Sequence, residues 1–312
     1  MKLIWAGRFV MFALGLAGAA DAAVADSDGF VRGAGAAVFM SRDNENFSTQ
    51  RIAIEYLPRY KHIESLTGVR LTAHRYRQNN WSRDGQQLTV LHRNIDPATA
   101  NGWQVEAGLF RQGGYDLLTA DGSYRTALAK HTGLELLINR DAVETVNALD
   151  NGVHFNFVGA GVEQELDPHI TLVGLGARQE FSDGNNRNHV RLKLIAQPKL
   201  DLGLTLQARY RTYTSSGASL TYFNPSHYDE TMLALGWRQR LRGWATSLTI
   251  GAGQQHVAGS PGTPTRLLEA AIQSPPSHHS TLRLRGGLNQ SASFNGPDYR
   301  YSYMQGEWVV EF

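Results

Sequence analysis

Residues 299–312 alternate between apolar and polar side chains and end the chain on an aromatic residue. Successive side chains of a β-strand point to opposite faces, so this segment has one face of each kind. Its apolar face carries Met304, Gly306, Trp308, Val310 and Phe312. Its polar face carries Tyr301, Tyr303, Gln305, Glu307 and Glu311. Such a strand separates an apolar phase from water, and the rest of the chain must supply a sheet that does the same.

The N-terminus has the composition of a secretory signal peptide. Lys2 and Arg8 form a basic start, residues 9–20 are apolar, and small-residue cleavage sites follow at 20–22 and 23–25. The apolar run is too short to span a bilayer as a helix. We therefore expect a cleaved signal peptide over residues 1–25 and one exported domain over residues 26–312. The chain has no cysteine, so no disulfide can hold this domain together.

The period of two continues through the rest of the sequence in sixteen alternating segments. They cover residues 30–40, 50–59, 68–78, 84–94, 101–112, 115–127, 132–140, 151–164, 169–182, 187–198, 201–213, 228–241, 244–256, 265–274, 279–291 and 299–312. Most of them approach the 9–11 residues that a tilted strand needs to cross the hydrocarbon of a membrane. In segment 187–198 the apolar face carries Val190, Leu192 and Leu194. In segment 151–164 it carries Val153, Phe155 and Phe157.

A sheet that lies in lipid has to close on itself, because every backbone N–H and C=O there needs a partner within the protein. Single-chain bacterial barrels have an even number of strands, short periplasmic turns and longer outer loops. They commonly end on an aromatic residue that serves as an assembly signal. We predict an all-β, antiparallel transmembrane β-barrel of about sixteen strands in the bacterial outer membrane; fourteen or eighteen strands also fit. A secreted β-sandwich or β-helix is the soluble alternative.

The links between segments follow the same scheme. Those at 166–169, 198–200, 242–243 and 275–277 are short and are predicted to be periplasmic turns. Those at 183–187, 215–227, 257–264 and 292–298 are longer and are predicted to be outer loops.

The polar faces are predicted to line the lumen of this barrel and to contact a solute there. These lumen-facing residues are Arg191, Lys193, Arg209, Arg211, Tyr213, Arg238, Arg240, Arg283, Arg285, Tyr301, Tyr303 and Glu307, with Glu106 and Glu311 on the same side. Sixteen strands enclose enough space for an aqueous channel. Arginine, glutamate and tyrosine can hydrogen-bond and stack on a long polar solute. The alternative is that arginine and glutamate pair across the lumen and brace the wall. The excess of basic residues suits a neutral or anionic solute.

One loop carries a more specific signal. Tyr222-Phe223-Asn224-Pro225, followed by Tyr228 and a strand, resembles the barrel domain of exopolysaccharide-export porins, which secrete poly-N-acetylglucosamine or cellulose. The resemblance implies a polysaccharide conduit. That family carries a periplasmic tetratricopeptide scaffold, whereas this sequence shows no helical repeat, so either a separate periplasmic secretion partner supplies one or the barrel has a different role. Alternatively, the Asn-Pro turn and its aromatic neighbours only anchor the loop to the barrel rim.

Other classes of function find little support in the sequence. Ser226, His227, Asp229 and Glu230 lie together and could form a hydrolytic or metal site, but neighbours on one loop seldom converge. His278, His279 and Ser280 are read as solvated turn residues. We expect no enzyme, no metal site, no cofactor and no nucleic-acid surface. The expected partners are outer-membrane lipid, the barrel assembly machinery and a polysaccharide. A general or small-solute porin and a structural or adhesin-like barrel with a filled lumen are the alternatives.

Overall fold

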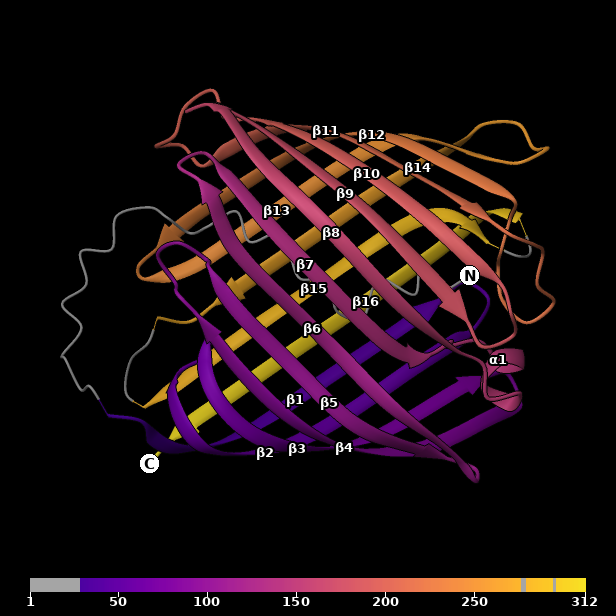
Figure 1. The fold of residues 1–312 in the computed structure, drawn as a ribbon, viewed down its shortest axis with the longest axis horizontal. Coiled ribbons are helices and arrows are strands. Elements are labelled where there is room, and N and C mark those ends of the chain that lie inside the picture. Colours follow the sequence, from indigo (N-terminus) through magenta and orange to yellow (C-terminus); the bar gives the residue numbers. More distant parts are fainter. Residues whose placement is uncertain (1–28, 276–278, 294–295) are drawn as a thin grey trace.

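The chain forms one closed antiparallel barrel of sixteen strands in a computed structural model that describes residues 29–275, 279–293 and 296–312 (Figure 1). The predicted signal peptide and His278 lie outside the described residues. The first eight strands are β1 (Val31–Asp43), β2 (Phe47–His62), β3 (Ser65–Gln78), β4 (Trp81–Ile95), β5 (Gly102–Gln112), β6 (Tyr115–Ala129), β7 (Thr132–Ala142) and β8 (His154–Asp167). The others are β9 (Ile170–Phe181), β10 (Asn186–Ala196), β11 (Leu204–Ser215), β12 (His227–Leu241), β13 (Trp244–Val257), β14 (Thr263–Gln273), β15 (Ser280–Ser293) and β16 (Gly296–Glu311).

The last strand closes the barrel against the first, as its two-faced sequence predicts. β16 pairs with β1 from Gly33 opposite Glu311 to Asp43 opposite Tyr301. The N–H of the terminal Phe312 donates to the carbonyl of Arg32 at 2.9 Å. Every strand therefore has two neighbours, which is the condition for a sheet in lipid. No described helix is long and apolar enough to cross a membrane.

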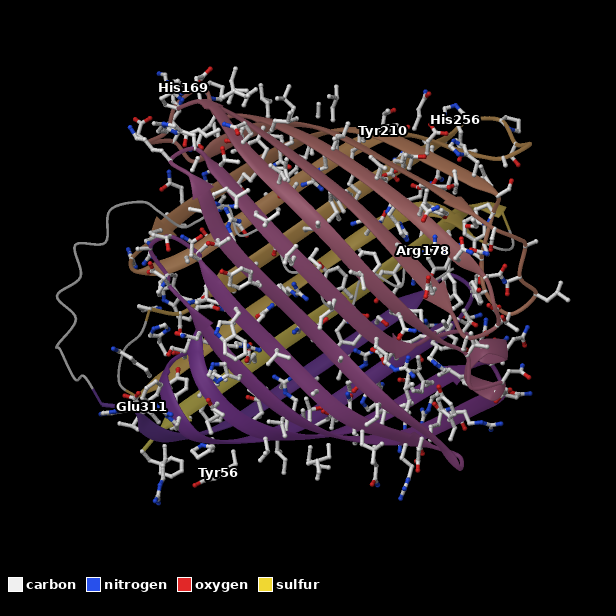
Figure 2. The ribbon with its side chains drawn as sticks, viewed as in Figure 1. Tyr56, His169, Arg178, Tyr210, His256 and Glu311 are labelled. Carbon is white, nitrogen blue, oxygen red and sulfur yellow. The ribbon has the colours of Figure 1, made fainter. Side chains whose placement is uncertain are left out.

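The outer surface of the barrel is the apolar one. Large apolar side chains that point away from the wall include Ile52, Ile54, Leu88, Val90, Leu118, Val158, Leu233 and Met304. Near the end that holds the C-terminus, exposed aromatic residues border this apolar surface: Tyr56, Trp103, Tyr124, Trp308 and Phe312. Figure 2 shows Tyr56 pointing away from the wall. An apolar band edged by aromatic residues is the surface that a membrane barrel presents to lipid.

The two ends of the barrel differ. The short helix α1 (Val146–Asp150) follows β7 and lies at the end opposite the C-terminus (Figure 1). The link of residues 216–226, between β11 and β12, is at the same end, which we call the outer end. The predicted long link at 292–298 is wrong in extent, because β15 continues to Ser293 and β16 begins at Gly296.

One strand turns the opposite face to lipid from the one its sequence favours. In β8 the aromatic face is inside: Phe155 and Phe157 are 4% and 3% exposed, whereas Val158 is 61% exposed. The two phenylalanines pack in a lumenal cluster with Leu175, Phe181 and residues of the outer links. The prediction that the aromatic face of this segment meets lipid is therefore wrong, and the cluster is the physical reason.

Candidate functional site

Charged side chains on one side of the lumen form a buried ion-pair network. Arg70 on β3 donates from Nε to Oε1 of Glu55 at 2.6 Å and from Nη1 to Oε2 of Glu106 at 2.7 Å. The Arg70 side chain is 5% exposed. Buried charges are tolerated only when they are paired and hydrogen-bonded, so each of these partners depends on the others.

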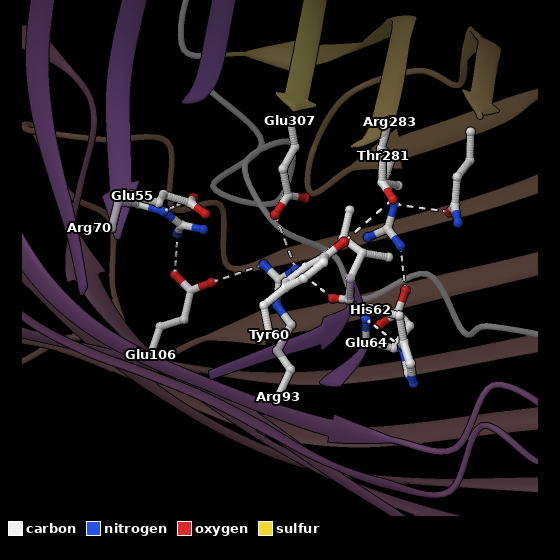
Figure 3. A network of polar contacts seen from close by, with 12 residues as sticks. Glu55, Tyr60, His62, Glu64, Arg70, Arg93, Glu106, Thr281, Arg283 and Glu307 are labelled. Carbon is white, nitrogen blue, oxygen red and sulfur yellow. Dashed lines mark hydrogen bonds and ion pairs between the residues drawn. The ribbon is translucent and has the colours of Figure 1, made fainter. Parts of the chain in front are cut away.

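Arg93 extends the network across three intervening strands (Figure 3). Its Nη1 donates to Oε1 of Glu307 on β16 at 3.2 Å, and its Nη2 donates to Oε1 of Glu106 at 3.5 Å. The inner face of β1 makes room for these side chains, because a Cβ on Gly35 would lie 2.9 Å from Oε2 of Glu55. We call Glu55, Arg70, Arg93, Glu106 and Glu307 the ion-pair network.

Below the network, toward the end of the barrel that holds the C-terminus, the same side of the lumen is filled with apolar side chains. Leu57, Tyr60, Leu66, Leu91 and Val309 form a cluster in which none is more than 3% exposed. The hydroxyl of Tyr60 donates to Oγ1 of Thr281 on β15 at 3.4 Å. Arg283, also on β15, pairs with Glu64 in the link between β2 and β3 (Figure 3). This side of the lumen is therefore braced and largely dry.

The side formed by β10, β11 and β12 is different. Its inner face carries a group of cations that we call the basic wall: Arg191, Lys193, Arg209, Arg211 and Arg238. Arg191 lies directly opposite Arg211, and Lys193 directly opposite Arg209, in the register of β10 and β11. Like charges at directly paired positions of a sheet destabilise it. The arrangement is therefore explained better by a function than by stability.

The residues of the basic wall are half-buried. Glu230 pairs with Arg211 at 2.8 Å, and Glu269 on β14 is the other carboxylate in this part of the lumen. The inner faces of β9 to β15 carry more cations than carboxylates, whereas those of β2 to β8 carry more carboxylates than cations. The field between the two sides favours an anionic solute next to the basic wall.

The outer end is covered by the link of residues 216–226. Arg187 on β10, which is 1% exposed, donates to the carbonyl of Phe223 at 2.7 Å and to Oδ1 of Asn224 at 2.8 Å. The ring of Tyr222 stacks on Phe181 at 4.4 Å. Its hydroxyl donates to Asp183 at 3.0 Å, and burial is the main cause that raises the pKa of Tyr222. This link is thus fixed to the inner wall.

The structure places the predicted lumen residues on the inner face, in different surroundings. Glu307 belongs to the ion-pair network, and Arg240 lies exposed at the edge near the C-terminal end. Arg285 donates to Oε1 of Gln305 at 3.0 Å. Tyr301 is buried near the outer end, and Tyr303 stacks beside it with ring centroids 6.1 Å apart. Contact of these residues with a solute stays a prediction.

The loop motif is buried against the barrel. Tyr222, Phe223 and Asn224 are at most 8% exposed, and Pro225 is half-buried. Tyr228 stacks on Tyr213 with ring centroids 4.8 Å apart. These contacts fit an anchoring role for the motif, which was the alternative to direct sugar contact.

The sequence missed the centre of the ion-pair network. Arg70, Arg93 and Glu55 sit on the polar faces of segments 68–78, 84–94 and 50–59, where the alternation could have marked them as lumenal. Arg70 and Glu55 lie directly opposite each other on the consecutive strands β2 and β3, a register that alternation alone does not give, and the contact of Arg93 with Glu307 forms only after closure. Among the described residues, no three His, Asp or Glu side chains are grouped to hold a metal ion. His227 and His256 approach Asp229 at 3.6 and 3.5 Å.

In sequence, no family model and no curated protein matches the chain. In structure, the chain is similar to a protein described as a bacterial polysaccharide outer membrane secretin, with a TM-score of 0.67 and 13% identity over 90% of this chain and 98% of the other. It is also similar to the outer membrane protein OprD from Pseudomonas aeruginosa, with a TM-score of 0.46 and 10% identity over 92% and 96%. The fold is that of an outer-membrane β-barrel, which confirms the predicted fold and the bacterial outer-membrane location.

Proposed function

We propose that this barrel is a channel that conducts an anionic polysaccharide across the outer membrane. The observation that carries the proposal is the basic wall, where cations are held opposite one another on β10 and β11. A row of such cations offers an anionic chain several weak sites in succession, so the chain can bind without being trapped. Tyr303, which is half-buried, adds an aromatic ring on which a sugar can stack.

Two further features support a polysaccharide over other solutes. The loop motif resembles that of exopolysaccharide-export porins, and the structure with a TM-score of 0.67 is described as a polysaccharide secretin. In this proposal the ion-pair network holds one side of the lumen rigid while the polymer follows the other side. A separate periplasmic partner delivers the polymer to the end that holds the C-terminus.

A small-solute porin is the second candidate. It is favoured by the link of residues 216–226, which Arg187 fixes across the outer end and which a polymer would have to pass. A small anion could pass beside this link without displacing it. The two candidates differ in whether the link has to move.

The first experiment is conductance of the purified barrel in a planar bilayer, with a salt gradient that reports ion selectivity. We expect an anion-selective current that a long anionic oligosaccharide blocks from the side of the C-terminus. A current that only small anions reduce would favour the porin, and the absence of any current would contradict both channels. Deletion of the gene then separates them, because only a conduit for polymer changes the amount of secreted polysaccharide.

A further inference from the structure

A groove runs across the membrane-facing surface of the barrel, from β13 to β3. It has a volume of about 1020 Å³. Two rows of directly paired, outward-pointing residues form it. One row consists of Leu248, Ala270, Gly286, Met304, Met40 and Gln50. The next row consists of Leu268, Leu288, Ser302, Arg42, Ser48 and Arg77.

The groove changes character along its length. Leu248 is four residues from the start of β13, whereas Arg42 and Arg77 each lie one residue from the outer end of their strands. A row perpendicular to tilted strands climbs through the membrane, so the groove rises from the hydrocarbon to the outer interface. Its lower part is apolar and is deepened by the small residues Ala270 and Gly286, and its upper part is polar and basic.

Four arginines surround the upper part of this groove on the outward face. Arg42 and Arg77 line it. Arg266 and Arg300 lie two residues nearer the outer end than Leu268 and Ser302, and Gln290 lies directly opposite both of them, between the two strands. All four are exposed. Within residues 29–275, 279–293 and 296–312, none of the four forms a salt bridge; Arg42 donates to Oδ1 of Asn46 at 3.2 Å.

Outward arginines elsewhere near the outer end are arranged differently. Arg75 pairs with Asp84 at 2.9 Å, Arg111 with Asp116 at 2.7 Å, and Arg178 with Glu180 at 2.8 Å. Figure 2 shows Arg178 toward the outer end of the barrel. Among the described residues, carboxylates thus accompany these three arginines but not the four around the groove, whereas Arg140, also outward, donates to the carbonyl of Leu118 at 2.9 Å.

We propose that this groove binds a phosphorylated lipid of the outer leaflet, with its acyl chains along the apolar part and its phosphate groups at Arg42, Arg77 and Arg300. Guanidinium groups bind phosphate with paired hydrogen bonds, and a basic cluster beside an apolar surface recognises anionic lipid headgroups. The lack of a paired carboxylate among the described residues fits this occupant, because the phosphate supplies the negative charge. The arginines and the two rows of side chains point outward, so lipid bound to them does not compete with a solute in the lumen.

The test compares two variants with three substitutions each. The groove variant carries Arg42→Gln, Arg77→Gln and Arg300→Gln; the control carries Arg75→Gln, Arg111→Gln and Arg178→Gln. Each protein is reconstituted in phosphatidylcholine vesicles that contain a small fraction of bisphosphorylated lipid A, then extracted in mild detergent. Native mass spectrometry counts the lipid A that stays bound. We expect the groove variant to retain about tenfold less than the wild type, and the control to match the wild type.

Three outcomes overturn the proposal. They are equal loss in both variants, equal retention by the wild type of lipid A from which the phosphates have been removed, and displacement of the bound lipid by millimolar inorganic phosphate. If the groove variant fails to insert, Ala270→Phe provides a second test, because it fills the apolar floor and leaves every charge in place. We expect Ala270→Phe to lower retention as well, and unchanged retention in this variant contradicts a lipid seated in the groove.

Discussion

The charged side chains on the two sides of the lumen differ in their partners and in their burial. In the ion-pair network, each arginine has carboxylate partners within 3.5 Å and is almost fully buried. In the basic wall, cations lie opposite cations and stay half-buried. The barrel closes in the same way on both sides, so backbone pairing does not account for the difference. The difference comes from the side chains that face inward and from the partners that they contact.

The ion-pair network and the basic wall are therefore expected to have different roles, the first in stability and the second in acting on ions in the lumen. Charges that are buried with their partners contribute to holding β2, β3, β4, β5 and β16 together, and removing one partner leaves another charge buried alone. Cations that lie opposite other cations and are only half-buried are expected to contribute little to stability, and their field acts on mobile ions. Substitutions on the two sides should therefore change different properties.

The largest effect is expected from Glu106→Gln in the ion-pair network. This carboxylate accepts from both Arg70 and Arg93, so its loss leaves two buried cations with too few partners. We expect a loss of about 3–5 kcal/mol in the free energy of unfolding, measured by urea titration in detergent. The matched control on the other side is Glu269→Gln, which should change it by about 0.5 kcal/mol or less. Equal effects would remove the distinction between the two sides.

The next effect concerns conduction and not stability. Arg191→Glu with Arg209→Glu converts the basic wall into one with nearly balanced charge. We expect the reversal potential in a salt gradient to move toward cation selectivity, while the urea midpoint stays close to that of the wild type. The control exchanges the outward Arg111 for Glu. A control that moves the reversal potential as far as the double variant would show that surface charge, and not the basic wall, determines selectivity.

A smaller conductance effect is expected from Arg283→Ala with Arg285→Ala on β15. In the sequence these two residues look equivalent to the basic wall. In the structure, Arg283 pairs with Glu64 and Arg285 donates to Gln305. Part of their charge is therefore compensated, and we expect a shift in reversal potential that is measurable but smaller than that of the basic-wall variant, with folding intact. A larger shift would place the conducting path next to β15.

Arg187→Met tests the outer end. The substitution keeps an unbranched side chain in place of the aliphatic part of arginine and removes the donors to Phe223 and Asn224, which leaves two buried acceptors without this partner. We expect a loss of about 1–3 kcal/mol in the free energy of unfolding and a higher single-channel conductance, because the link of residues 216–226 is released. Proteolysis of the intact barrel in vesicles should then cut this link first. Unchanged conductance would mean that the link does not restrict the path.

The sequence predicted the strands well because a strand in lipid is specified locally. All sixteen alternating segments became strands, including those between residues 113 and 150, and the inner position of Arg191 follows from outward Val190 and Leu192 alone. The alternation requires only that lipid lies on one side of the barrel wall and water on the other. It fails in β8, where Phe155 and Phe157 face inward because the outer links fold over them.

The pairing of the lumenal charges could not be predicted in the same way. Arg93 and Glu307 are 214 residues apart in the chain and meet only because β16 closes against β1. The network also needs the small Gly35, because a Cβ there would lie 2.9 Å from Oε2 of Glu55, and in the sequence it is one glycine among many. Alternation tells which side chains enter the lumen, whereas closure and side-chain size decide which of them meet.

The smallest effect is expected at the lower edge of the braced side, in the link between β4 and β5. Asp96 accepts from the hydroxyl of Thr99 at 2.7 Å and from the N–H of Ala98 at 2.9 Å. These hydrogen bonds lower the pKa of Asp96 below its ordinary value of 3.8. Their contribution to stability is therefore present at neutral pH and is lost as the pH falls through the lowered pKa. Hydrogen exchange of the Ala98 amide should accelerate relative to a reference peptide below about pH 4. In Asp96→Asn this pH dependence should vanish, while the ion-pair network above the link stays intact. A variant that also loosened the network would show that the edge and the centre of this side unfold as one unit.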